Sequence, residues 1–223
     1  RLDSDIIGWK DEVLDYLDTN NSVFVGYTDY ECDAKVVSIV KNGEITEEAS
    51  LGDDVIVVLD KTPFYAESGG QVADVGRLVF DGATVEIDDC KKDSLKHFLH
   101  IGHVTEGSVK VGDICRASID VERRNAIKRN HTSAHLLQAA LREDLGDHVH
   151  QAGSYVDDQR LRFDFSHFSA VTSDEMKKIE SIVNSQILKD TIVENYETDI
   201  ENAKGAMALF GEKYGDRVRV CKV

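Results

Sequence analysis

Hydrophobic and polar positions divide the chain into a strand-rich first half and a mixed second half. Between residues 22 and 119, short runs of β-branched or alternating apolar residues are separated by turn signals such as "KNGE", "ESGG", "FDGA" and "KVGD". Many short strands at this spacing are typical of a small barrel or sandwich. The predicted strands are residues 22–27, 34–40, 54–60, 76–80, 83–87, 97–104 and 113–119.

Helical spacing of apolar residues predicts three helices outside this region. The first covers residues 5–18. The second begins at Asp120, an acceptable N-cap, and runs to about Leu145, where Gly146 ends it. The third covers residues 172–190 and has acidic residues in its first turn. Its N-cap is Thr172 or Ser173, and its apolar face consists of Met176, Ile179, Ile182, Val183 and Ile187.

The remaining segments complete an α+β pattern in the second half. Four further strands and one mostly helical stretch are predicted there, the strands at 150–156, 160–165, 191–198 and 216–223 and the helical stretch at 199–215. The sequence therefore predicts a β-rich N-terminal part and an α+β C-terminal part, joined around residues 118–121. We divide it into residues 1–20, 21–119 and 120–223.

Composition places the chain among globular proteins. Its hydrophobic fraction is 41% and it contains a single proline, which argues against a disordered chain. It has no apolar run long enough to span a membrane and no signal-peptide pattern at its start. The four cysteines form no CxxC pair, so free thiols in a reducing, cytoplasmic setting are expected. The absence of an initiator Met suggests a piece of a longer polypeptide.

Charge argues against extensive nucleic-acid contact but leaves one exception. The net charge is −16, which repels phosphate. Residues 116–135 nevertheless carry a local balance of +3. The basic residues of this segment are Arg116, Arg123, Arg124, Lys128 and Arg129. Taken alone, such a segment is most simply a solvated helix face.

Two histidines lie four residues apart in the predicted helix that begins at Asp120. His131 and His135 share one face there, and two imidazoles so placed can chelate one tetrahedral zinc ion. The spacing alone is weak evidence, since two ordinary polar residues on a helix face would show it as well. No Glu follows His131, which excludes the metalloprotease pattern HExxH.

A second histidine cluster, "KHFLHIGH", contains His97, His100 and His103. A spacing of three does not suit a strand, in which side chains alternate with period two. We therefore expect exposed histidines that bind no metal. Cys221 is expected to be a small core hydrophobe in a buried strand.

A glycine-rich segment, "TPFYAESGGQVADVG", spans residues 62–76. Its glycines permit positive φ angles and close backbone approach, which predicts a hairpin turn at a barrel edge. The segment matches neither GxGxxG nor GxxxxGKS, so a nucleotide-phosphate cradle is not expected. Gln151, in "HVHQAGSYV", is a neutral donor and acceptor close to the end of the histidine helix.

Four stretches in this order resemble the editing region of the alanyl-tRNA synthetases. They are "TPFYAESGGQVADVG", "RNHTSAHLLQAALREDLGDHVHQAGS", "LRFDFSHF" and "KGAMALFGEKYGDRVRV". The resemblance covers residues 22–223, and residues 1–20 resemble the end of the tRNA-recognition part. Free-standing alanyl-tRNA editing proteins share the histidine motif, but "FYAESGGQ" and "ALFGEKYG" favour the synthetases.

The resemblance implies a fold and a reaction. The fold is of the α+β class, a small antiparallel β-barrel (21–119) followed by an α+β editing core (120–223) of the threonyl/alanyl-tRNA synthetase second additional domain type. The implied reaction is zinc-dependent hydrolysis of Ser-tRNA(Ala) and Gly-tRNA(Ala), within an enzyme that ligates alanine to tRNA(Ala) using ATP. The implied partners are tRNA(Ala) and the rest of the synthetase chain.

The resemblance also implies roles for individual residues. His131 and His135 match two zinc ligands of the family, whose other two belong to a later CxGTH motif. The sequence stops at "VRVCKV", and Cys221 is not that cysteine because no GTH follows it. We therefore expect little zinc binding and little or no activity from these residues alone. The other candidate site residues are Gln151, Thr132 and Ser133 for catalysis and specificity, and Lys128, Arg129, Gly69, Gly70 and Gln71 for tRNA or substrate.

Three functional readings follow from the sequence. The first is an editing hydrolase, and the second is a non-catalytic tRNA-binding or interaction module that retains the fold. A free-standing trans-editing protein is a variant of the first reading. In the third, the histidine pair is purely structural.

Overall fold

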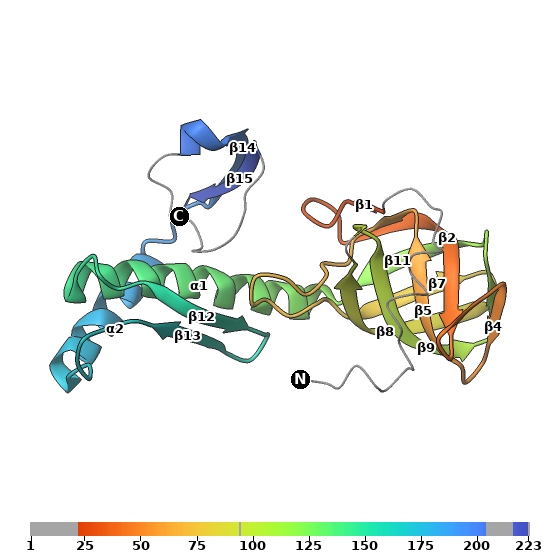
Figure 1. Ribbon diagram of the computed structural model, residues 1–223, viewed down its shortest axis with the longest axis horizontal. Helices are drawn as coiled ribbons and strands as arrows, with labels where there is room; N and C mark the ends of the chain where they lie inside the picture. Colours follow the sequence, from red (N-terminus) through yellow and green to blue (C-terminus); the bar gives the residue numbers. More distant parts are fainter. Residues whose placement is uncertain (1–21, 94, 204–215, 223) are drawn as a thin grey trace. The chain divides into compact units, whose positions relative to one another are not determined.

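A computed structural model describes residues 22–93, 95–203 and 216–222 (Figure 1). The chain divides into two compact units between Ala126 and Ile127, within helix α1 (Val121–Leu145), and each unit is considered by itself. The predicted helix at 5–18 and most of the stretch 199–215 lie outside the described residues. Across the described ranges, no helix combines the length and the apolar character needed to cross a membrane.

The first unit is a closed antiparallel barrel, which confirms the predicted architecture. Six strands follow one another around the sheet in the order β11-β7-β8-β9-β5-β2, and pairing of β11 with β2 closes it. In chain order they are β2 (Glu31–Lys41), β5 (Asp54–Leu59), β7 (Gly76–Phe80), β8 (Ala83–Lys92), β9 (Phe98–Glu106) and β11 (Ile114–Ile119). Closure leaves no unpaired edge between these strands.

Shorter strands extend the barrel at its ends. In the "KNGE" turn, Asn42 and Gly43 both have positive φ, as a two-residue hairpin requires, and lead into β3 (Glu44–Thr46). The other short strands form two pairs, β4 (Glu48–Ser50) with β10 (Ser108–Lys110) and β1 (Val23–Phe24) with β6 (Lys61–Thr62). The predicted strand at 22–27 is therefore reduced to two residues.

The barrel core explains why β5 reads as a continuous apolar run. Five of its six residues are buried, because one face points into the main core and the other packs on a second apolar cluster. Val55, Val57 and Leu59 belong to the main core. Ile56 and Val58 pack with Val40 and Leu99 in the second cluster. A strand that is covered on both faces does not alternate between apolar and polar residues.

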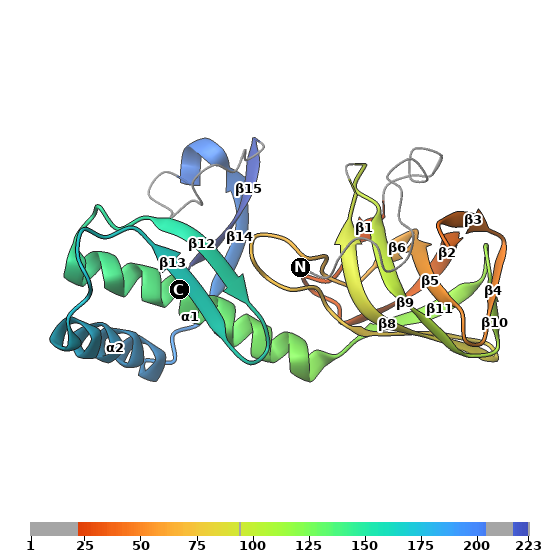
Figure 2. The same cartoon turned by 60° about the horizontal axis from the view of Figure 1, so that its bottom comes forward.

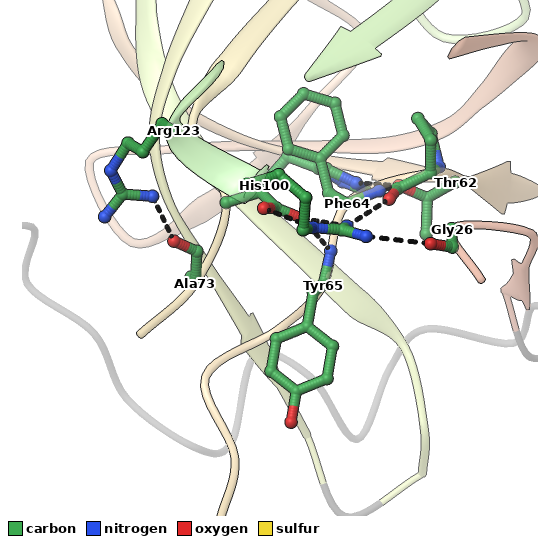
Figure 3. Close-up of polar contacts among 10 residues, drawn as sticks. Gly26, Thr62, Phe64, Tyr65, Ala73, His100 and Arg123 are labelled. Carbon is green, nitrogen blue, oxygen red and sulfur yellow. Dashed lines mark hydrogen bonds and ion pairs between the residues drawn. The ribbon is translucent and has the colours of Figure 1, made fainter. Parts of the chain in front are cut away.

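The histidines of "KHFLHIGH" are not all exposed, and the prediction was wrong for two of them. His97 is 1% exposed and its Nδ1 lies 2.7 Å from a carboxylate oxygen of Asp93. His100 is fully buried, and its Nδ1 lies 2.8 Å from the Val57 carbonyl oxygen. Its Nε2 lies 2.7 Å from the Thr62 hydroxyl (Figure 3). Their partners satisfy the imidazoles, which explains why the barrel tolerates them. His103 alone lies partly at the surface, with 44% of its side chain exposed.

Burial of His100 predicts a specific dependence of stability on pH. Desolvation lowers the pKa of His100 from 6.5 to about 4, against the opposing effect of its hydrogen bond to Val57. Between pH 4 and pH 6.5, the unfolded chain therefore binds a proton at this histidine more readily than the folded chain does. The free energy of unfolding should fall as the pH decreases from 6.5 to 4, by roughly 3 kcal/mol in total.

Urea unfolding at pH 7 and pH 4.5 measures this effect. His100→Gln keeps a polar group but does not titrate, so its free energy of unfolding should depend less on pH than that of the unchanged protein. Equal pH dependence in the two proteins would show that His100 is not responsible.

The second unit packs two helices against a β-ribbon. The ribbon consists of β12 (Gln151–Val156) and β13 (Leu161–Phe165), both of which were predicted. Helix α2 (Ser173–Leu188) begins with a capping box in which Thr172 is the N-cap, one of the two predicted residues. The buried core consists of Ala140, Leu141, Val149 and Ile179. On the predicted apolar face of α2, Met176 and Ile187 are instead exposed.

The end of the described chain forms a second, isolated ribbon. Strands β14 (Glu194–Asp199) and β15 (Arg217–Lys222) pair along six residues, and a short 3-10 helix, η2 (Ile200–Ala203), follows β14. Cys221 is exposed, so the prediction of a buried cysteine was wrong. Within the described residues, β15 pairs with β14 alone, and most residues of both strands are exposed.

Candidate functional site

Helix α1 brings His131 and His135 together on one face. The two imidazole centroids lie 5.2 Å apart and the ring planes differ by 16°, so the rings stack. Both side chains are half-buried, and Ala134 between them is buried. The regular i, i+4 geometry of the helix therefore produces the arrangement that the spacing predicted.

The surroundings of the pair favour neutral imidazoles. Burial lowers the pKa of His131, and the neighbouring charge of His135 lowers it further. Burial also lowers the pKa of His135. Both rings are thus uncharged at neutral pH, which is the form that can offer a nitrogen lone pair to a metal ion.

Two imidazoles fit half of a zinc site. Structural and catalytic zinc ions in proteins take three or four protein ligands, commonly His, Cys, Asp or Glu. Within the described ranges, no group of three or more such residues is placed to hold a metal ion. His131 and His135 could therefore offer two donors to such a site, and imidazole nitrogen is a donor type that suits zinc.

The β12–β13 ribbon runs alongside α1 (Figure 2). Near one end of β12, Val149 packs with Ala140 and Leu141. Just beyond its other end, the Asp157 carbonyl oxygen accepts a hydrogen bond of 2.8 Å from Asn130 Nδ2. Because both histidines lie between these helix contacts, β12 passes along the histidine segment.

The polar site candidates of this unit differ in their availability. Gln151 is the first residue of β12, beside a register irregularity of the ribbon, and its side chain is half-exposed. The Ser133 hydroxyl donates a hydrogen bond of 2.9 Å to the Arg129 carbonyl oxygen, which ties it to the helix backbone. Thr132 is half-buried on the same turn. Lys128 and Arg129 are exposed one turn before the histidines.

The glycine-rich segment of the first unit forms a tight turn, as predicted. Ser68 and Gln71 exchange backbone hydrogen bonds of 3.2 and 3.0 Å around Gly69 and Gly70. Both glycines have positive φ, 59° and 82°, which a two-residue turn of this kind requires. Gln71 is 7% exposed, so its side chain packs inside the unit, and its role toward substrate stays a prediction.

A buried ion pair anchors this segment, and the sequence interpretation missed it. Arg124 is 6% exposed and Asp74 1% exposed, and the two form a salt bridge. The same guanidinium donates to the carbonyl oxygens of Gly26 and Pro63, at 2.8 and 3.1 Å. Asp74 in turn accepts a hydrogen bond of 2.7 Å from the backbone N–H of Tyr65.

The basic segment 116–135 is therefore not a uniformly solvated helix face. Besides Arg124, Arg123 donates a hydrogen bond of 2.7 Å to the Ala73 carbonyl oxygen (Figure 3). Arg116 pairs with Glu31 and Asp33 on the barrel wall. One signal could have revealed the buried arginine, because Arg124 precedes the apolar Ile127 by three residues and so shares its buried helix face.

Comparison with known proteins gives a consistent result. The family model described as "tRNA synthetases class II (A)" matches residues 6–123, more than half of the chain. A protein of Acetivibrio thermocellus named alanine–tRNA ligase is 51% identical over 218 residues, which are 96% of this chain and 25% of that protein. Proteins of the same name from Saccharophagus degradans and Alkaliphilus oremlandii are 53% and 46% identical, over 88% and 100% of this chain.

These relatives are much longer than the present chain of 223 residues. The chain spans about a quarter of the length of the three relatives, at 25%, 23% and 26%. The match nevertheless extends over nearly all of the chain at high identity. The chain belongs to the class II tRNA synthetase (A) family.

Proposed function

We propose that the chain is the editing segment of an alanine–tRNA ligase, which hydrolyses Ser-tRNA(Ala) and Gly-tRNA(Ala). The observation that carries the proposal is the pair of half-buried, stacked imidazoles of His131 and His135, whose pKa values are both lowered. Its position within a chain about 50% identical to proteins named alanine–tRNA ligase supports the choice of tRNA ester over other hydrolysable substrates.

The proposal extends to the full-length protein that contains this segment. That protein would ligate alanine to tRNA, as the name of the relatives suggests. The use of ATP, the specificity for tRNA(Ala) and a cytoplasmic location are expected from the family resemblance. The editing segment would remove the wrong amino acid after ligation. Its partners would be tRNA(Ala) and the remaining parts of the synthetase.

His131 and His135 would hold zinc together with ligands from the CxGTH motif that the family resemblance leads us to expect. When bound, zinc can polarise a carbonyl, activate water or orient a substrate. In this proposal the two neutral imidazoles would bind the metal. Helix α1 would hold the two rings in a fixed relative orientation.

Selection of serine requires a partner for its hydroxyl group. A site that hydrogen-bonds a substrate hydroxyl discriminates strongly against an analogue that lacks it. Gln151 offers both a donor and an acceptor from β12, and Thr132 offers a hydroxyl one residue after His131. The Ser133 hydroxyl is already bonded to the helix, which makes it the weaker candidate.

The test is deacylation by the full-length protein. Ser-tRNA(Ala), Gly-tRNA(Ala) and correctly charged Ala-tRNA(Ala) are each incubated with it, and loss of the labelled amino acid is followed. Faster hydrolysis of the first two supports the proposal. Binding of tRNA with no hydrolysis of any substrate would favour a non-catalytic tRNA-binding module instead.

Lys128 and Arg129 are proposed to contact the acceptor end of tRNA. Reversal of both charges (Lys128→Glu with Arg129→Glu) should weaken tRNA affinity at low salt, because each lost phosphate contact removes an electrostatic contribution. Zinc content should not change. Filter binding at two salt concentrations measures the effect, and Lys177→Glu on α2, an exposed lysine of the same unit, is the matched control. Unchanged affinity of the double variant would remove these residues from the tRNA contact.

A further inference from the structure

Three aromatic rings from two loops of the second unit form a stack that the proposed active site does not use. Phe168 lies on His148 with a centroid distance of 4.3 Å and an interplanar angle of 20°. His167 lies at the edge of His148, with a centroid distance of 5.1 Å and an interplanar angle of 22°, and its ring is tilted by 38° from that of Phe168 at 6.2 Å. His148 precedes β12 and His167 and Phe168 follow β13, so the ring stack joins the two segments that enter and leave the ribbon.

Hydrogen bonds hold this ring stack in place. His148 Nε2 lies 2.9 Å from His167 Nδ1, which places one N–H donor opposite one acceptor. The two segments are further joined by a backbone hydrogen bond of 3.0 Å from Ser166 N–H to the His150 carbonyl oxygen. The rings therefore form part of a fixed corner of the unit rather than the end of a loose loop.

Phe168 is nevertheless 87% exposed. The apolar core of the unit includes Phe163 and Phe165 but leaves Phe168 out, so its ring contributes little to folding. The stack also has no composition suited to metal binding, because no third His, Cys, Asp or Glu in the described ranges completes such a group. Its prominent feature is a flat apolar ring that is largely exposed to solvent and lies on the ring of His148.

A ring of this kind suits a nucleobase better than a protein surface. Stable protein interfaces need about 800 Å² from each partner, with an apolar centre. The exposed neighbours of Phe168 are instead small or polar, namely Ser166, Ser169 and Ala170. An unpaired base can stack on one planar ring, and this contribution to affinity is separate from the electrostatic contribution of basic residues. That last property matters in a chain whose net charge is −16.

We propose that Phe168, whose ring lies on that of His148, is a stacking platform for an unpaired base of the bound tRNA. The identification of the RNA as tRNA rests on the proposed function. The stacking itself rests on the ring geometry and the exposure of Phe168.

Four variants of the full-length protein test the platform. Phe168→Ala removes the ring, Phe168→Leu keeps an apolar group without a flat face, and Phe168→Tyr keeps the ring. Leu188→Ala removes an apolar side chain of similar exposure, 84%, from α2 and serves as the matched control. Thermal unfolding of all four confirms that each is folded before binding is measured.

The measurement is the dissociation constant for uncharged tRNA(Ala) at two salt concentrations. Phe168→Ala and Phe168→Leu should each weaken binding by about fivefold or more, which is the lower end for loss of one stacked base. The ratio to the unchanged protein should be the same at both salt concentrations, because stacking releases no counterions. Phe168→Tyr and Leu188→Ala should bind as the unchanged protein does.

Unchanged affinity of Phe168→Ala, or equal affinity of the Leu and Tyr variants, would overturn the platform. A loss of equal size in Leu188→Ala would do the same. Because the assay uses uncharged tRNA, it decides the stacking separately from hydrolysis. A protein that binds through Phe168 but does not deacylate Ser-tRNA(Ala) would retain the platform and refute the proposed editing activity.

Discussion

Replacing Asp74 by alanine is expected to lower the free energy of unfolding by about 3–5 kcal/mol, the usual cost of leaving one partner of a buried ion pair uncompensated. The substitution leaves the Arg124 guanidinium, 6% exposed, without its carboxylate. It also removes the acceptor for the Tyr65 backbone N–H. Urea or thermal unfolding monitored by circular dichroism measures the loss.

A double variant separates the uncompensated charge from the loss of packing. In Asp74→Leu with Arg124→Met, neither side chain is charged, so much of the lost stability should return. The polar contacts of Arg124 to Gly26 and Pro63 are still lost, which limits the recovery.

Arg116→Ala provides a surface comparison. Arg116 pairs with Glu31 and Asp33 at exposed positions, where ion pairs contribute little, so the variant should unfold almost as the unchanged protein does. If Asp74→Ala were as stable as Arg116→Ala, the buried pair would not anchor the glycine-rich segment.

Replacing either histidine of the α1 pair is expected to reduce deacylation of Ser-tRNA(Ala) by more than about 100-fold in the full-length protein. Changes in residues that only support a metal ligand already cost about 10–100-fold, and His131 and His135 are proposed as ligands themselves. The loss should appear mainly in kcat, since neither histidine is proposed to bind the tRNA phosphates. Single-turnover deacylation of His131→Ala and His135→Ala measures it.

His103→Ala is the matched control for this experiment. His103 is a half-exposed histidine on the barrel whose Nδ1 lies 3.0 Å from Asp88, so its removal deletes an imidazole without touching α1. Its deacylation rate should be unchanged. The structural reading of the histidine pair predicts instead that the α1 variants lose stability but, where still folded, keep their rate.

Local sequence was sufficient to predict most strands of the first unit, whereas the choice of a barrel over a sandwich came from the family resemblance. The strand at 76–80 was predicted with its observed bounds, because "GRLVF" lies between the turns of "ESGG" and "FDGA". The N-cap roles of Asp120 and Thr172 were predicted for the same reason, since a cap depends on residues three positions away. Closure of the barrel by β11 and β2 joins residues more than 70 positions apart, which no local pattern records.

The wrong predictions share a physical cause, which is that the deciding partner lies elsewhere in the chain. His100 is buried because Val57 and Thr62 satisfy its two nitrogens from other strands. Arg124 is buried because Asp74, fifty residues earlier, neutralises it. Burial of Cys221 was predicted from the residues of its own strand, whereas burial depends on what packs against that strand.

The candidate site was also predictable only where it depends on local spacing. The pairing of His131 with His135 follows from helix geometry alone, so four residues of spacing were enough. The lowered pKa values were not predictable, because they depend on burial by the folded unit. The relation of β12 to the histidine segment also required the structure, since it depends on Asn130 and Val149.

The central claim is that His131 and His135 belong to a zinc-dependent editing site. Its most direct test is the rate of Ser-tRNA(Ala) deacylation by the full-length protein before zinc removal, after removal with a chelator, and after zinc is restored. The account predicts that the rate falls on removal and recovers on addition of zinc in the unchanged protein, but not in His131→Ala. A rate that is unaffected by zinc removal, with the metal shown to be absent by mass spectrometry, would contradict it.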